Sequence, residues 1–263
     1  MNHKAGWALV KGTWMMWVQQ RGFFWLLAFN WMLPALIYLF VWSTAAGGGD
    51  VGGISRGEFA AYYLILILVN QLTYSQTNWT VGDVIRGGEL NTWLVRPIPA
   101  VYNVLSTEVA GKVVYMLFAV PVVAGLALLF KPELHTTPGA ALAALVALAL
   151  AWALRFLWGF WLALLAFWAT RADALLALQD SLVFLLAGQV APVALLPGWM
   201  HALAVALPFR YMVSFPIEVL MGQISGAEVG LGFAIQVAWL LAALGLYGLM
   251  WRRGIRHYEA VGG

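Results

Sequence analysis

Long hydrophobic runs separated by short polar interruptions fill most of the chain. A membrane-spanning helix needs about 20 apolar residues, because the hydrocarbon core is about 30 Å thick and each helical residue rises about 1.5 Å. Six segments meet this requirement, so we predict an all-α, polytopic membrane protein with six transmembrane helices in a single domain, residues 1–263. The segments run approximately from Phe23 to Trp42, Phe59 to Thr80, Ala100 to Phe130, Gly139 to Ala169, Ala174 to Leu196, and Gly230 to Trp251.

Two other apolar stretches are not expected to cross the membrane. In residues 1–22, an apolar stripe at helical spacing predicts a helix lying along the membrane surface, although a plain extension of the first crossing is the alternative. The stripe consists of Trp7, Val10, Trp14, Trp17 and Val18. Residues 197–228 contain two short apolar pieces divided by Pro208, which predicts an external or re-entrant helical hairpin, or else an ordinary apolar loop.

The basic residues are distributed unevenly between the two sides of the predicted bundle. Positive residues collect in cytoplasmic loops, and here ten fall on one side and three on the other. This places both termini in the cytoplasm, in agreement with an even number of crossings. The ten are Lys4, Lys11, Arg21, Arg86, Arg96, Lys112, Arg171, Arg252, Arg253 and Arg256; the three are Arg56, Lys131 and Arg210.

Polar side chains gather in the inner half of the second predicted crossing. Asn70, Thr73, Tyr74 and Thr77 share one helical face. Polar groups avoid lipid, so this face is expected either to line a transport pathway or dimer interface, or to hydrogen-bond to a neighbouring helix.

Charged residues also fall inside the predicted spans. Arg155 and Asp180 are candidates for an intramembrane charge pair, the alternative being that Arg155 snorkels and Asp180 reaches the inner interface. Glu108 and Lys112 are spaced for an ion pair along one helix, which we interpret as structural.

The residues needed for several kinds of chemistry are missing from the sequence. The 263 residues contain no Cys, and none of the 4 His has a metal-ligand partner at helical spacing. The Gly111-Lys112 pair lacks the other residues of a nucleotide-binding loop. With a net charge of only +3, the chain is not expected to bind nucleic acid. We therefore expect no enzyme activity and no cofactor on this chain, and any ATP must bind to another polypeptide.

The loop between the second and third predicted crossings is rich in charge. A short helix over residues 83–94, ended by the Arg96-Pro97 step, would form a rigid knob suited to docking on a partner, although a solvated connector fits the composition as well.

These features together resemble the type-2 family of ATP-binding cassette (ABC) permeases, especially a short bacterial subfamily with a separately encoded ATPase. The resemblance rests on residues 94–99 (LVRPIP), residues 208–222 (PFRYMVSFPIEVLMG) and the basic tail, residues 252–263. It implies that residues 1–22 are a connecting helix and that residues 83–94 are a coupling helix seated on the ATPase. The ATPase-coupling residues would be Asp83, Arg86, Glu89, Leu90, Trp93 and Arg96.

The resemblance further implies a bacterial inner-membrane complex. Two permeases, identical or related, would face each other above two ATPase subunits that bind ATP and Mg. The cargo would be hydrophobic, lipid-like, an antibiotic or a glycan, moved by alternating access. A membrane scaffold or sensor that docks a partner without transporting anything is the alternative, whereas a lone ion-coupled carrier would require inverted repeats and more buried carboxylates.

Overall fold

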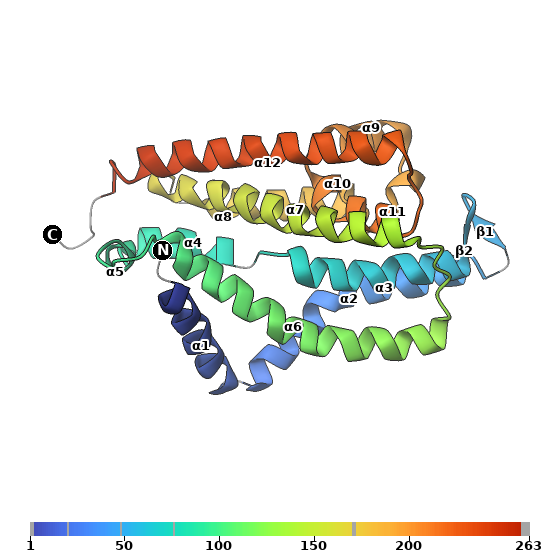
Figure 1. Ribbon diagram of the computed structural model, residues 1–263, viewed down its shortest axis with the longest axis horizontal. Helices are drawn as coiled ribbons and strands as arrows, with labels where there is room; N and C mark the ends of the chain where they lie inside the picture. The colour runs from blue at the N-terminus through green and yellow to red at the C-terminus, as the bar shows by residue number, and fades with distance from the viewer. Residues whose placement is uncertain (1–2, 20, 48, 76, 170–171, 259–263) are drawn as a thin grey trace.

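The computed structural model describes residues 3–19, 21–47, 49–75, 77–169 and 172–258, and this part of the chain is almost entirely helical (Figure 1). The only strands in it, β1 (Asp50–Val51) and β2 (Ile54–Ser55), form a two-residue antiparallel ladder. The long helices are α1 (His3–Gln19), α2 (Arg21–Ala45), α3 (Arg56–Thr73), α6 (Val101–Phe130), α7 (Pro138–Ala163), α8 (Ala172–Leu186) and α12 (Ala227–Gly254). The all-α prediction is confirmed.

Three helices among the described residues are long and apolar enough to cross a membrane: α6, α12, and α7 together with the 3₁₀ turn η1 (Leu164–Phe167). They correspond to the third, sixth and fourth predicted crossings. The described apolar part of α2, Phe29–Ala45, is shorter. The chain thus has the composition and helices of a polytopic membrane protein, and the number of six crossings stays a prediction.

The C-terminal ends predicted for the second and fifth crossings are wrong. The second was expected to be continuous to Thr80, but α3 ends at Thr73, and Tyr74 takes an extended conformation (φ −60°, ψ 135°). The fifth was expected to reach Leu196, but α8 ends at Leu186. Gly188 follows with φ +77°. Glycine adopts this left-handed conformation without strain, and it commonly terminates a helix in this way.

Helices α3, α7 and α12 run along the long axis of the molecule, with different features at its two ends (Figure 1). The short helix α5 (Leu90–Leu94) and the C-terminal end of α12 lie at one end. The β1–β2 hairpin and the short helices α9 (Gly198–Ala206) and α11 (Ser214–Leu220) lie at the other. Extensive contacts join α12 to α7, α2 to α3 and α3 to α6.

Helix α1 is separate from α2 and runs obliquely to the long axis (Figure 1). It packs against α6, where Trp14 Nε1 donates a hydrogen bond to the Ala110 carbonyl (3.0 Å). This arrangement disfavours a plain extension of the first crossing. The side chains of Trp17 and Val18, part of the predicted stripe, lie outside the described residues.

The segment predicted as a hairpin folds as three short helices, α9, α10 (Phe209–Met212) and α11, rather than two. The second predicted piece is divided at Val213 (φ −140°, ψ −65°). Gln236 of α12 is fully buried and donates hydrogen bonds to the carbonyls of Ala147 on α7 (3.0 Å) and Tyr211 on α10 (2.9 Å). The amide of Gln236 therefore connects α10 with the long helices α7 and α12.

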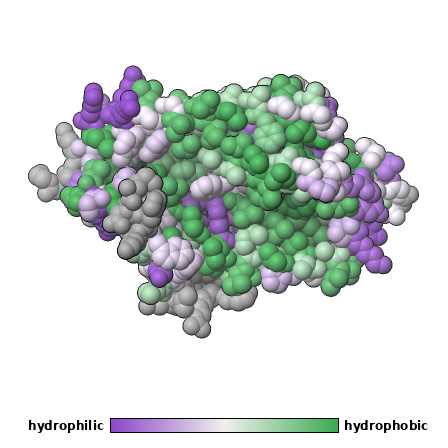
Figure 2. All heavy atoms as spheres, viewed as in Figure 1, coloured by the Kyte–Doolittle hydropathy of each residue, from purple (hydrophilic) through white to green (hydrophobic). Residues whose placement is uncertain are grey.

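Hydrophobic side chains cover most of the face shown in Figure 2, with hydrophilic groups concentrated toward the two ends. Exposed large apolar residues lie on α2, α6, α7 and α12, including Ile37, Leu128, Leu142 and Leu241. A surface of this kind would aggregate in water, because soluble monomers rarely expose large continuous apolar areas. It is the expected surface of a protein surrounded by lipid.

Candidate functional site

The centre of the molecule contains a buried polar group where α3 ends. Arg155 on α7 is only 4% exposed, and its Nη1 donates hydrogen bonds to Asn70 Oδ1 (3.1 Å) and Thr73 Oγ1 (3.2 Å). Its guanidinium also lies over the ring of Tyr74, 4.9 Å from the ring centroid. Three residues of the predicted polar face thus surround one buried cation, which fits the interhelical hydrogen-bonding interpretation of that face.

Two details of the predicted polar face differ from a continuous helix. Tyr74 follows α3 in an extended conformation and approaches Arg155 through its ring. Thr77 begins the next helix, α4 (Thr77–Arg86), and its side chain lies outside the described residues.

Arg155 and Asp180 do not form the direct charge pair that the sequence suggested. In the described part of the chain no ion pair joins them, although they interact electrostatically at longer range. Asp180 on α8 instead accepts hydrogen bonds from Trp79 Nε1 (3.2 Å) and Gln179 Nε2 (3.4 Å). Arg155 bonds to the neutral oxygens of Asn70 and Thr73 instead, because the end of α3 packs against α7 beside it.

A second cluster of buried charges stabilises the break in the helix after α3. Lys112 and Glu108 on α6 form the expected ion pair (2.8 Å), with side chains 15% and 3% exposed. Lys112 Nζ also donates to the carbonyl of Tyr74 (2.9 Å), and Ser75 Oγ donates to Glu108 Oε1 (2.9 Å). The i,i+4 spacing indicated this pair, but nothing in the sequence showed that it would hold the end of another helix.

The predicted helix over residues 83–94 is in fact two helices, α4 and α5, separated by a turn. Gly88 in this turn has φ +74°, where other residues are strained, so glycine at this position allows the helix to end and the turn to form. Arg86, at the end of α4, bonds to Asp83 (2.6 Å) and to Asp173 of α8 (3.0 Å). The hydrogen bond to Asp83 raises the pKa of Arg86 most, and the hydrogen bond to Asp173 raises it further.

The other predicted ATPase-coupling residues divide into inward and outward groups. Leu90 is buried, and Trp93 packs partly against the same hydrophobic cluster as Leu90. Glu89 and Arg96 are exposed, and Arg96 donates to Asn103 (3.0 Å). Val95, just before the Arg96-Pro97 step and not among the predicted coupling residues, is 82% exposed at the end of α5.

A cavity of about 490 Å³ lies at the end of the molecule opposite α5, beside α9, α11 and α12. Its wall includes a buried pair in which Arg210 donates to both carboxylate oxygens of Glu218. Burial alone would lower the pKa of Arg210, but the hydrogen bonds and charge of Glu218 outweigh it and raise that pKa. The spacing of Arg210 and Glu218 in the sequence did not indicate this pair.

The apolar exterior, the spanning helices and the buried polar groups between them define a polytopic α-helical membrane protein. A family model described as "ABC-2 family transporter protein" matches residues 29–262, and the chain belongs to this family. No curated protein and no solved structure matches the chain. Family membership supports a role as the membrane permease of an ABC transporter that works with an ABC ATPase.

Proposed function

We propose that the chain is the permease subunit of an ATP-driven exporter whose ATPase is a separate polypeptide. The match to the ABC-2 transporter family over residues 29–262 carries this proposal. The absence of a nucleotide-binding loop from the sequence is consistent with ATP binding on a partner. In this proposal two permeases and two ATPase subunits assemble in a bacterial inner membrane, with both permease termini in the cytoplasm.

The α4–α5 segment is the proposed ATPase docking surface. It lies at the end of the molecule where α12 terminates, and the predicted topology places this end in the cytoplasm (Figure 1). Arg86 connects α4 to Asp173 of α8, so a push on α4 would reach the helix bundle. ATPase closure could in this way change the packing of α7 and α8, which contact each other, and drive alternating access.

Co-purification in detergent tests the proposal. The permease should bring down a nucleotide-hydrolysing subunit whose ATPase rate changes when cargo is added. A chain that purifies with a partner but with no nucleotide-hydrolysing subunit would support the scaffold or sensor instead.

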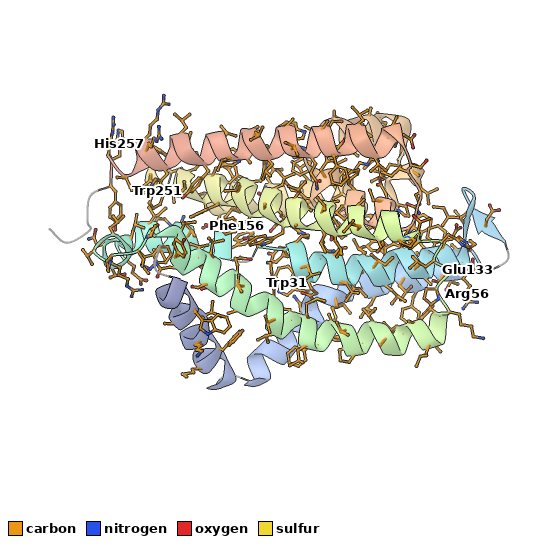
Figure 3. The ribbon with its side chains drawn as sticks, in the orientation of Figure 1. Trp31, Arg56, Glu133, Phe156, Trp251 and His257 are labelled. Atoms are coloured by element: carbon orange, nitrogen blue, oxygen red, sulfur yellow. The ribbon has the colours of Figure 1, made fainter. Side chains whose placement is uncertain are left out.

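Two matched variants test the docking surface. Val95→Asp should reduce the amount of co-purified ATPase several-fold, because it replaces an exposed apolar side chain at the end of α5 by a charged one. Leu134→Asp adds the same charge at an exposed site in the α6–α7 loop, next to Glu133, which Figure 3 places at the opposite end, and it should leave the ATPase bound. Glu89→Arg is a second useful variant, whereas Arg86 is unsuitable because reversing its charge also breaks the contact with Asp173. Equal retention of the ATPase by all these variants would refute the docking assignment.

A further inference from the structure

A cavity of about 150 Å³ lies between α2, α3, α7 and α8. Its lining includes Trp31, Asn70, Tyr74, Arg155, Asp180 and Phe184. Figure 3 shows Trp31 near the middle of the long axis, between Arg56 and Glu133 at one end and Trp251 and His257 at the other. The cavity therefore lies at membrane depth.

A cation and an anion face this cavity without touching each other. Arg155 uses two hydrogen bonds to neutral oxygens, Asn70 Oδ1 and Thr73 Oγ1, although a guanidinium carries five N–H donors. Asp180 accepts from Trp79 and Gln179, both neutral, and a carboxylate has about four acceptor sites. Among the described residues no ion pair satisfies either charge.

Opposite charges at membrane depth normally pair directly, because an unpaired charge is costly there. Here the two groups line one cavity from α7 and α8 and interact only beyond ion-pair distance. A ligand that carries both charges would satisfy Arg155 and Asp180 together, whereas a ligand with a single charge would satisfy one of them.

The walls of the cavity are aromatic and continue into an apolar surface. Trp31 and Tyr74 lie with their ring centroids 4.3 Å apart, and Phe184 lines the cavity from α8. Along α2, Phe29, Leu33 and Ile37 are exposed close to Trp31 in the chain. A hydrocarbon chain attached to a group inside the cavity could lie along this exposed face of α2.

We propose that this cavity binds the zwitterionic headgroup of an amphiphile, with its phosphate on Arg155, its ammonium on Asp180 and its hydrocarbon chain along α2. We also assign this amphiphile as the exported cargo, and only that step rests on the proposed export function. The binding itself is a property of this chain and is measurable without an ATPase.

The test is a binding measurement on the detergent-purified full chain. The probes are lysophosphatidylethanolamine, which is zwitterionic, and lysophosphatidylglycerol of the same chain length, which is anionic. The native chain should bind the zwitterionic probe about tenfold more tightly, because an additional charge-assisted hydrogen bond is worth about one factor of ten or more. Equal affinity for the two probes would overturn the proposal.

Variants locate the selectivity at the cavity. Asp180→Asn should abolish the preference for the zwitterionic probe while retaining affinity for the anionic one, a result that misfolding cannot produce. Asp50→Asn, a carboxylate far from the cavity at the β1–β2 hairpin, should keep the native preference. Arg155→Lys keeps the positive charge and should bind both probes more weakly than the native chain. Retention of the preference by Asp180→Asn would place the ligand elsewhere and refute the site.

O-Phosphoethanolamine has the same headgroup but no hydrocarbon chain. It therefore distinguishes binding of an amphiphile from binding of a free zwitterion. It should compete at least tenfold less well than the lysolipid. Equal competition would show that a free zwitterion binds, and the amphiphile assignment would be wrong. Because none of these measurements involves ATP, their failure would leave the proposed permease function intact, and loss of the ATPase partner would leave the binding result intact.

Discussion

Lys112 on α6 donates a hydrogen bond to the backbone carbonyl of Tyr74 (2.9 Å), the extended residue that follows α3. A carbonyl freed by a helix break has no water to accept from in a lipid environment, so another helix must satisfy it. Lys112 does this while also pairing with Glu108 of its own helix. The break between α3 and α4 is therefore a stabilised feature of the fold.

Replacing Lys112 should destabilise this region strongly. Lys112→Met leaves Glu108 buried without its lysine and should lower the free energy of unfolding by about 3 kcal/mol. SDS titration of the purified chain in mixed micelles measures this loss. The double variant Glu108→Gln with Lys112→Met should lose less than Lys112→Met alone, since no uncompensated charge remains. A double variant that loses the sum of the two single losses would show that the pair is not coupled.

The contact between Arg155 and Thr73 predicts a smaller loss. Thr73→Val preserves shape but removes one acceptor of a buried guanidinium, so it should cost about 1–3 kcal/mol of unfolding free energy. Thr92→Val, on exposed α5, makes the same chemical change and should be nearly neutral. Comparable losses in the two variants would mean that the hydrogen bond to Arg155 contributes nothing.

Tyr62 and Tyr63 form a natural comparison at the turn after α8. Tyr62 Oη donates to the Gly188 carbonyl (2.8 Å), whereas the Val190 carbonyl accepts from both Tyr63 (2.9 Å) and Trp42 (2.8 Å). Tyr62→Phe should therefore cost about 1–2 kcal/mol, and Tyr63→Phe less than about 1 kcal/mol. Thermal unfolding in detergent can rank the two variants, and the reverse order would contradict this assignment of donors.

Gly232 and Gly245 on α12 should respond oppositely to a methyl group. At Gly232 the added Cβ would collide with the ring of Phe215, which is fully buried in α11. Gly232→Ala should thus cost about 1–3 kcal/mol through overpacking. Gly245 has open space around it, so Gly245→Ala should be neutral or stabilise the helix by up to about 1 kcal/mol. Equal melting temperatures for the two variants would refute the close approach of α12 to α11.

The sequence by itself determined that this protein is helical and surrounded by lipid. Long apolar runs can bury their backbone polar groups in a membrane only as helices, and this constraint is readable residue by residue. It also determined the Glu108–Lys112 pair, since i,i+4 spacing is local. Residues 94–99 and 208–222 and the basic tail pointed to the transporter family that the comparison over residues 29–262 shows.

Only the tertiary structure decided where α3 ends and which groups meet Arg155. Helical periodicity continued through Tyr74, but the break is stabilised by Lys112 and Glu108 from α6, which the local sequence of α3 cannot reveal. Likewise, Arg155 contacts Asn70 and Thr73 rather than Asp180 because of the way α3 packs against α7. Helix formation depends on neighbours in sequence, whereas the pairing of buried charges depends on neighbours in space.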